Sequence, residues 1–402
     1  MADAQHRGSS GIGAGRTSGA QSHSGGDGMI AVSRRLRVLC LVPQLGAGGA
    51  ERVMVMIANR LSTAHDVMLL TWEVPGTPPF YALADGVQLR QAGLFAEGRW
   101  AKASALWRRA RTVRQQVTSH RADVMLSFLD TTNMIAIVGL LGTGVPVVVS
   151  ERVDPARHDL GWMLMRLRLL VYPLADRVVV QTRRVASYFP ARMQARIVEL
   201  PNPIAPASMI ASPGTPRQDG RFRIVAMGRL VPQKGFDRLI EAFARLAGRY
   251  PMWDVVIFGE GPDRPSLEHH ANAAGLRGRV TLAGVTAASQ TELAASHLFA
   301  FPSRFEGFPN ALGEAMATGL PAVGYDGVSG VEEMIEDGIN GVLLHEKADI
   351  EALASALGLL MADAGLRVRM GAAAVIRAAR WAEDAIVSDW EKVLLESARG
   401  KL

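Results

Sequence analysis

Two glutamates flank a Gly-Phe-Pro-Asn turn in a stretch whose other residues are mostly apolar or small. The stretch SRFEGFPNALGEAMATGLP places seven residues between Glu306 and Glu314. An ionised carboxylate accepts two hydrogen bonds, each worth about 1.5–3 kcal/mol when it is charge-assisted, and it therefore suits a vicinal diol. Two such carboxylates can hold two diols, as in a ribose and a hexose. The structural alternative is that Glu314 complements a helix dipole and that Glu306 is a solvated loop residue.

Two cations follow the strand-like run RIVAMG, in the segment MGRLVPQKGFDRL at 227–239. Gly228 permits a tight turn, and Arg229 and Lys234 carry positive charge just ahead of a helical pattern. Such a loop suits a diphosphate, because two cations can neutralise it as a leaving group without a metal. After the next strand-like run, the turn FGEGP places Glu260 near the expected nucleotide base or ribose.

The loop that contains Glu306 follows the strand-like run LFAFPS, and NALGEAMA then begins a helix with Asn310 as the expected N-cap. The free N–H groups of a helix start favour an anion by roughly 0.3–1 kcal/mol when they are exposed. A phosphate is therefore the expected ligand at this helix start.

The elements that position these residues repeat along the chain. Short β-branched runs alternate with longer helical patterns, which is typical of parallel sheets. We expect an α/β fold of two doubly wound, Rossmann-like domains facing a central cleft, at residues 34–205 and 206–380, with a linker near 201–220 and a last helix, 381–402, packing back across both. The expected strands are 37–42, 66–72, 123–128, 146–150, 177–182, 223–228, 254–259, 279–284, 298–303, 321–326 and 341–345.

Composition limits the class of protein. The chain has 402 residues, 49% hydrophobic and 20% charged, which suffices for more than one core. Cys40 is the only cysteine, which excludes an internal disulfide framework, indicates a reducing compartment and leaves no readable Cys/His metal cluster. Residues 1–28 contain eight glycines and five serines, so we expect 1–33 to be a disordered tail without a secretory signal. The uncharged stretch 131–150 predicts a helix, a turn and a buried strand rather than a membrane span.

Positive charge is concentrated in the first half of the chain. Residues 34–205 carry 22 Lys and Arg against 12 Asp and Glu, whereas residues 206–402 carry 20 against 24. Much of it lies in RWAKASALWRRARTVRQQ at 99–116, which also holds Trp100 and Trp107. This segment is either a solvated helix face or a helix on an anionic leaflet. No recognised nucleic-acid module surrounds this segment, so we expect no nucleic acid as a partner. We expect the protein itself to be cytoplasmic and peripheral on the inner face of the membrane, with the anionic membrane surface as a partner.

Taken in order, these segments resemble the retaining glycosyltransferases of family 4, which have the GT-B fold, over about residues 37–397. The resemblance implies that Glu306 binds the hexose of a sugar donor, Glu314 its ribose, and Arg229 and Lys234 its diphosphate. It also implies that no metal or cofactor takes part. The sugar-donor site implied in this way further includes Gly228, Glu260, Gly307, Phe308, Pro309, Asn310, Ala311 and Leu312.

The first domain opens with PQLGAGGAERVMVM. Its glycines half match a dinucleotide fingerprint, and Glu73 ends the second strand where a ribose-binding acid would lie, but Glu51 replaces the third glycine and would obstruct close helix–strand packing. The GGAER form resembles members of the family that add hexoses or N-acetylhexosamines to lipid-linked precursors of surface polysaccharides and glycans. In those members Gly48 and Gly49 would line the acceptor side.

One departure from the family concerns the sugar carbon that reacts. Many relatives have a His after a first-domain strand, whereas this strand ends as VVVSERVDP, with Glu151 in the comparable place. Glu151 is a catalytic candidate that could orient the sugar donor or the acceptor, or else a salt-bridged structural residue. Asp130, after another strand, is a candidate for the acceptor pocket, and His158 is expected at the surface.

The resemblance implies transfer of a hexose from a UDP- or GDP-sugar to a lipid-linked saccharide, with front-face attack and retention of configuration. Three alternatives stay open at this point. They are a nucleotide-sugar epimerase of the same architecture, an NAD-dependent Rossmann oxidoreductase, and a non-catalytic membrane adaptor.

Overall fold

The computed structural model describes residues 34–94, 101–156 and 161–400. The expected tail at 1–33 lies outside the described residues, as do Arg99, Trp100 and His158. The side chains of residues 101–104, and with them that of Lys102, are also outside the described part.

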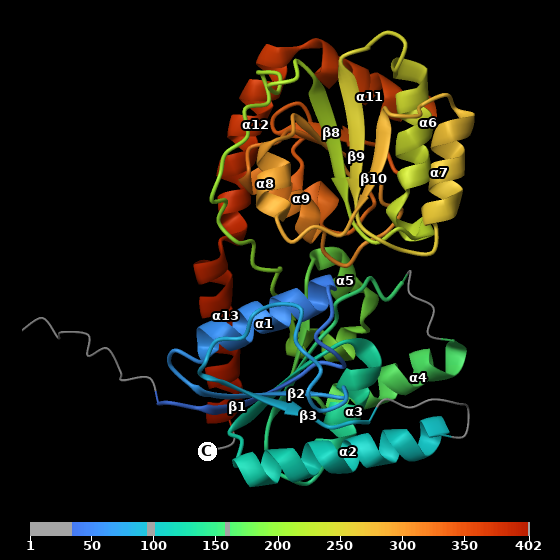
Figure 1. Ribbon diagram of the computed structural model, residues 1–402. Helices are drawn as coiled ribbons and strands as arrows, with labels where there is room; N and C mark the ends of the chain where they lie inside the picture. The colour runs from blue at the N-terminus through green and yellow to red at the C-terminus, as the bar shows by residue number, and fades with distance from the viewer. Residues whose placement is uncertain (1–33, 95–100, 157–160, 401–402) are drawn as a thin grey trace, which may run out of the picture. The chain divides into compact units, whose positions relative to one another are not determined.

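The first sheet has seven parallel strands in the order β3-β2-β1-β4-β5-β6-β7. Figure 1 labels its neighbouring strands β1, β2 and β3. The order reverses between β1 and β4, so the loops after these strands diverge at a topological switch point, where open parallel sheets bind ligands. The strands are β1 Arg37–Leu41, β2 Asp66–Thr71, β3 Val87–Gln91, β4 Val124–Phe128, β5 Val147–Ser150, β6 Arg177–Val180 and β7 Ile197–Glu199.

Both faces of the first sheet are buried. Val38 and Cys40 of β1 belong to a core shared with helix α1, whereas Leu39 and Leu41 belong to a second core shared with α2 and α3. Such two-sided burial explains why these strands are continuous apolar runs. The helices of this half are α1 Gly49–Leu61, α2 Ala101–His120, α3 Asp130–Leu140, α4 Trp162–Val171 and α5 Arg183–Tyr188, with the 3-10 helices η1 Tyr172–Leu174 and η2 Ala191–Arg196.

The second sheet has six parallel strands in the order β10-β9-β8-β11-β12-β13. Helices from both faces share its single core. The strands are β8 Phe222–Met227, β9 Trp253–Phe258, β10 Val280–Gly284, β11 Leu298–Ala300, β12 Ala322–Tyr325 and β13 Gly341–Leu344. The helices are α6 Phe236–Leu246, α7 Arg264–Ala273, α8 Ser289–Ala294, α9 Asn310–Ala317, α10 Val331–Met334, α11 Ile350–Ala362 and α12 Ala364–Ala378, with the 3-10 helices η3 Pro232–Lys234 and η4 Ala379–Trp381.

The last helix, α13 Glu383–Arg399, packs into the first half of the chain. Its Ile386, Trp390 and Leu394 belong to the core between the first sheet and α1. The Trp390 ring lies 5.6 Å from that of Phe128 at the end of β4. Trp381, just ahead of α13, belongs instead to the core of the second sheet. The predicted domain boundaries at residues 34, 206 and 381 stay predictions.

The predicted α/β fold with two parallel sheets is confirmed, and all eleven expected strands are present. Two strands were missed, β3 and β7, and both lie at edges of the first sheet. The stretch 131–150 forms α3, a turn and β5, as predicted. None of the helices in the described ranges combines the length and apolar character needed to cross a bilayer.

Candidate active site

Two of the predicted catalytic residues are in direct contact. Lys234 lies at the end of η3, after β8, and its Nζ is 2.6 Å from Oε1 of Glu306, in the loop after β11. The Glu306 residue is only 6% exposed. Gln233 donates a hydrogen bond to the Phe305 carbonyl over 2.8 Å and so ties the same two loops together. The carboxyl ends of β8 and β11 therefore bring a cation and an acid into one ion pair.

Glycines bring a third loop onto this cation loop. A Cβ on Gly259 would collide with the carbonyl oxygen of Gly228, and one on Gly261 with that of Leu230. The turn FGEGP thus needs its glycines for close backbone packing. Glu260 itself is exposed, and its carboxylate accepts from Arg264 over 2.6 Å. The turn lies beside the cation loop, and the Glu260 side chain is held by Arg264.

Arg229 is the second predicted cation of this loop. Its side chain is exposed, and it makes no hydrogen bond or ion pair with any residue in the described ranges. Lys234 is already paired with Glu306, whereas Arg229 gives the same loop a positive charge that no described carboxylate compensates. Such a charge is the kind that attracts an anionic ligand.

Glu314, on α9, has a partner that the sequence did not predict. Arg52 Nη1 donates a hydrogen bond to Glu314 Oε1, and the Glu314 side chain is 12% exposed. Burial disfavours the charge of Arg52, but the carboxylate outweighs burial and raises the pKa of the guanidinium above its ordinary value. Arg52 belongs to the GGAER segment and lies in the first turn of α1.

The expected N-cap role of Asn310 is wrong. Pro309 occupies the N-cap position of α9 without a side-chain cap, and Asn310 is the first helical residue. The physical reason is that Asn310 Oδ1 accepts a hydrogen bond from Asn202 Nδ2 over 2.6 Å instead. Asn202 Oδ1 in turn accepts from Arg152 Nη2 and from Gln181 Nε2, each over 2.6 Å.

The remaining residues of the predicted sugar-donor loop are mostly packed. Phe308 and Leu312 are buried in the core of the second sheet, and Ala311 packs against it. The backbone N–H groups of Asn310 and Leu312 donate to carbonyls within the loop, of Phe308 and Pro309 respectively. This loop therefore turns fewer free amides toward a ligand than a bare helix start would.

Close approach disfavours a side chain at three of the predicted positions, by backbone at Gly307 and by side chains at Gly49 and Gly48. A Cβ on Gly307 would collide with the Arg152 carbonyl oxygen and lie 2.7 Å from Gln181 Oε1. A Cβ on Gly49 would lie 2.9 Å from Asn310 Nδ2. At Gly48, a Cβ would collide with the carboxylate of Glu51, which is buried in the first turn of α1.

The residues that sequence reasoning missed are Arg52, Arg152, Gln181 and Asn202. The last three follow the carboxyl ends of β5, β6 and β7 within three residues. Their position along the strands was the signal that could have found them, because the carboxyl ends of parallel strands meet at one edge of a sheet. Burial lowers the pKa of the Arg152 guanidinium to about 9, and Glu51 partly offsets this.

Glu151 lies in the interior, 2% exposed. Its carboxylate accepts a hydrogen bond from the Tyr172 hydroxyl, and Arg168 Nη1 lies 3.8 Å away. Burial raises the pKa of the Glu151 carboxyl to about 7, opposed by Arg168 and Tyr172 and reinforced by Asp130. Asp130 itself is the first residue of α3, where its Oδ1 accepts from the Thr131 N–H. This placement favours the salt-bridged structural interpretation of Glu151.

The raised pKa predicts a stability change with pH. Between pH about 4.5 and about 7 the unfolded chain releases the Glu151 proton and the folded chain keeps it, so the free energy of unfolding should fall as pH rises. Glu151→Gln removes this proton but keeps an acceptor for Tyr172, and should make that slope shallower. Urea unfolding of both proteins across the window measures it. Identical slopes would contradict the burial of an ionisable Glu151.

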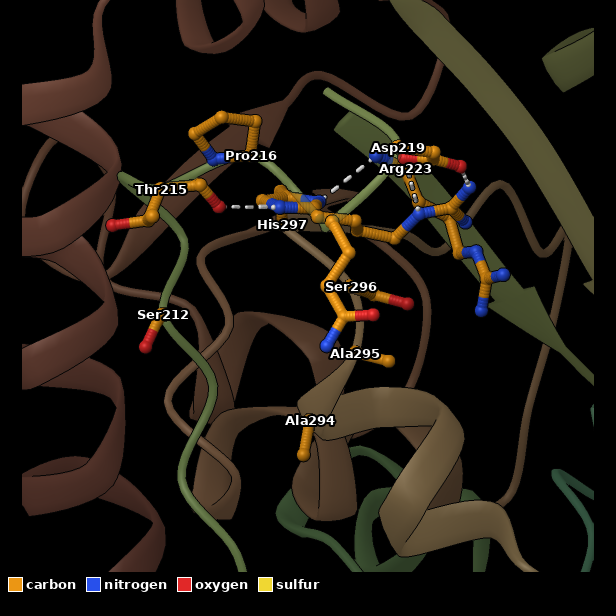
Figure 2. Close-up of a pocket in the computed structure, with 11 residues that line it drawn as sticks. Ser212, Thr215, Pro216, Asp219, Arg223, Ala294, Ala295, Ser296 and His297 are labelled. Carbon is orange, nitrogen blue, oxygen red and sulfur yellow. Dashed lines mark hydrogen bonds and ion pairs between the residues drawn. The ribbon is translucent and has the colours of Figure 1, made fainter. Parts of the chain in front are cut away.

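A surface hollow of about 540 Å³ lies elsewhere, at the amino ends of β8 and β11 (Figure 2). Ser296 and His297 are its buried polar residues, but both ring nitrogens of His297 are engaged, Nδ1 with the Arg223 N–H and Nε2 with the Thr215 carbonyl. No three His, Cys, Asp or Glu side chains group as metal ligands in the described part of the chain. The candidate site is therefore the one at the carboxyl ends of β8 and β11.

Two family models match the chain, one for each half. The model described as Glycosyltransferase Family 4 matches residues 47–208, and the model described as Glycosyl transferases group 1 matches residues 211–376. Among solved structures, Anabaena HepE in complex with UDP and glucose superposes with a TM-score of 0.72 at 18% identity, covering 90% of this chain and 99% of that one. At that identity the likeness concerns the fold alone.

Three curated relatives are similar over most of the chain. The exopolysaccharide phosphotransferase of Streptomyces coelicolor is 30% identical over 87% of this chain, which spans only 39% of that longer protein. A Campylobacter jejuni alpha-1,4-N-acetyl-D-galactosaminyltransferase, whose full name includes diNAcBac-PP-undecaprenol, is 25% identical over 90% of this chain and 99% of its own length.

The third relative is the alpha-D-kanosaminyltransferase of Streptomyces kanamyceticus, which is 31% identical over 68% of this chain and 76% of its own length. Its similarity runs across both matched halves rather than through one of them, since the aligned 301 residues exceed the length of either family-model match. The chain therefore belongs to glycosyltransferase family 4, and it is a hexosyltransferase of polysaccharide or glycan biosynthesis.

Proposed function

We propose that this enzyme moves a hexose or N-acetylhexosamine from a nucleoside-diphosphate sugar to a saccharide carried on a polyprenyl diphosphate, with retention of the anomeric configuration. The observation that carries the proposal is the Lys234–Glu306 ion pair beside the exposed Arg229. Two comparisons support it. Anabaena HepE binds UDP and glucose, and the Campylobacter relative is named for a PP-undecaprenol saccharide.

We assign the sugar donor to the carboxyl ends of β8, β9 and β11. Arg229 and Lys234 bind the diphosphate, Glu306 accepts hydrogen bonds from the hexose, and Glu314 accepts them from the ribose. Lys234 has three N–H donors and uses one on Glu306, so it can hold the carboxylate and a phosphate oxygen together. The ion pair then fixes the distance between the phosphate site and the hexose site.

The proposed reaction is a front-face displacement. The acceptor hydroxyl approaches the anomeric carbon on the side from which the diphosphate leaves, and a new carbon–oxygen bond forms as the bond to phosphate breaks. The leaving phosphate oxygen takes the proton of the acceptor hydroxyl. Stabilisation of the negative charge on that oxygen by Arg229 and Lys234 is the main catalytic term, because charge develops there in the transition state.

We assign the acceptor side to residues 34–205, with Gly48, Gly49 and Asp130 facing the acceptor, and the sugar-donor side to residues 206–380. The boundary between the two family models, at 208 and 211, supports this division. We assign Glu151 a positioning role: it accepts from Tyr172 and pairs with Arg168, and it precedes Arg152 in the chain.

We propose that the enzyme works at the cytoplasmic face of the inner membrane. Helix α2 exposes Arg108, Arg111 and Trp107, which suits an anionic surface. Two other arginines of this helix serve the fold, since Arg109 donates to the Leu94 carbonyl and Arg114 to the Leu141 carbonyl.

The proposal predicts the outcome of a screen of UDP- and GDP-sugars, each with and without a polyprenyl-diphosphate saccharide. Nucleoside diphosphate should be released from one sugar donor and faster with acceptor, and NMR of the product should show the anomeric configuration of the donor. An inverted linkage would overturn the retaining mechanism. Conversion of a nucleotide sugar to its epimer without acceptor would overturn transfer in favour of epimerisation.

A further inference from the structure

Helix α4 follows β5 in the chain and lies beside α3 (Figure 1). It exposes a row of large apolar side chains. Met163, Leu167 and Leu170 are 65%, 43% and 70% exposed, and Leu174 of the adjoining η1 is 55% exposed. They follow one another at intervals of three or four residues and therefore lie along one side of the helix. Trp162, at the start of α4, is 72% exposed. We call these five residues the α4 stripe.

The inner side of α4 contains a buried charged residue, which is unusual for a surface helix. The buried residues of this helix are Arg168 and Val171. Arg168 is 1% exposed, its Nη1 lies 3.8 Å from Glu151, and its Nη2 donates to the Tyr188 hydroxyl over 2.9 Å. Three apolar residues of α4 also face the core, Leu164, Leu169 and Val171. The helix is therefore apolar on both sides, with one arginine turned inward and the α4 stripe left exposed, unlike an ordinary surface helix with a polar outer face.

The buried arginine explains why the stripe faces outward. Rotating α4 to cover its apolar side would withdraw Arg168 from Glu151 and leave a buried carboxylate without its cation, which is strongly unfavourable. Scattered apolar residues on a surface are normal, but a continuous row of them marks a surface that is covered by something else.

The charge around the stripe indicates what covers it. From Trp162 to Leu174 the chain contains no acidic residue, and of its two arginines Arg168 is buried and Arg166 lies at the surface. Arg166 is exposed, and its guanidinium lies 5.5 Å from the centre of the Trp162 ring. An apolar row with Trp and Arg at its edge matches the boundary between the acyl chains and the anionic headgroups of a bilayer, where Arg keeps its charge in the headgroup layer.

We propose that α4 is the element that inserts into the membrane, lying in the plane of an anionic bilayer with the α4 stripe among the acyl chains. The inference rests on the proposed function, in which the acceptor is held in a bilayer. Insertion of α4 is distinct from electrostatic attraction by the basic helix α2, because the α4 stripe buries apolar side chains among the acyl chains. Arg168 connects the inserted helix to Glu151, and the next residue, Arg152, binds Asn202 beside Asn310.

The test is flotation of the full chain with vesicles of phosphatidylcholine and phosphatidylglycerol in equal parts. The variants are Trp162→Ser and the double change Leu167→Ser with Leu170→Ser. Each should lower vesicle partitioning by at least about tenfold, equivalent to about 1.4 kcal/mol. The matched control is Ile376→Ser, which removes a side chain that is 76% exposed on α12, and it should float like the wild type.

Three readouts separate the outcomes. Release of nucleoside diphosphate with a water-soluble acceptor should be the same in the α4 variants as in the wild type. If the wild type released no nucleoside diphosphate, the proposed function would be wrong, but the flotation result would still test membrane insertion. Wild-type flotation of both α4 variants would overturn the inference. A second outcome would also overturn it. If the wild type formed a dimer without lipid, and the α4 variants were monomers that floated like the wild type, the α4 stripe would be an interface between two copies of the chain.

Discussion

Replacing Lys234 with alanine is expected to lower kcat by at least about 100-fold, the scale found for one lost donor to a developing oxyanion. The change removes a cation from the leaving diphosphate and leaves the nearly buried Glu306 carboxylate without its partner 2.6 Å away. Steady-state release of nucleoside diphosphate measures the first effect. Thermal unfolding measures the second, because an unpaired carboxylate at this position should also lower stability.

Arg229→Ala separates the two effects. Arg229 is exposed and makes no ion pair within the described residues, so its loss should cost a similar factor in kcat with no change in thermal unfolding. Lys347→Ala, which removes an exposed lysine after β13, is the matched control and should behave as the wild type. Unchanged kcat in both Lys234→Ala and Arg229→Ala would refute the assignment of the diphosphate to this loop.

Glu306→Gln is expected to impair sugar transfer far more than binding of the free nucleoside diphosphate. Glutamine keeps the shape of the side chain but loses the charge-assisted acceptor for the hexose, worth about 1.5–3 kcal/mol or roughly 10- to 150-fold. The free diphosphate lacks the hexose and should bind nearly as before. Calorimetry of the diphosphate and kcat/KM for transfer, measured on the same variant, give the comparison.

Glu314→Gln is the companion variant. Its carboxylate is assigned to the ribose, which the sugar donor and the free diphosphate share, so both binding and transfer should weaken together. The variant also releases Arg52 from its ion pair. If Glu306→Gln weakened diphosphate binding as much as transfer, Glu306 would have no specific role toward the hexose.

The strands could be predicted because parallel sheets with both faces buried require unbroken apolar runs. β3 was missed because it lies at an edge of the sheet and only Val87 of VQLRQ is buried, and β7 because it is three residues long. The predicted strand 298–303 was too long. β11 ends at Ala300, because Pro302 has no N–H to donate to a neighbouring strand.

The contact between Lys234 and Glu306 could be predicted in outline, because both follow carboxyl ends of strands in one sheet. The partner of Glu314 could not, since Arg52 lies 262 residues earlier in the chain and on another sheet's helix. The prediction of Asn310 as an N-cap was wrong for the same reason, because its side chain accepts a hydrogen bond from Asn202, 108 residues away. Local patterns place a residue on an element, but its hydrogen-bond partner depends on how distant elements pack.

The position of α13 has a consequence for how the chain is made. Trp390 and its neighbours fill the core between the first sheet and α1, yet they leave the ribosome 191 residues after β7 ends at Glu199. At about 5–20 residues per second, this is a wait of roughly 10–40 s. During that time the nascent first sheet carries an uncovered apolar face beside Phe128. A chain released before α13 is made would keep this apolar face exposed, and we expect such a product to aggregate.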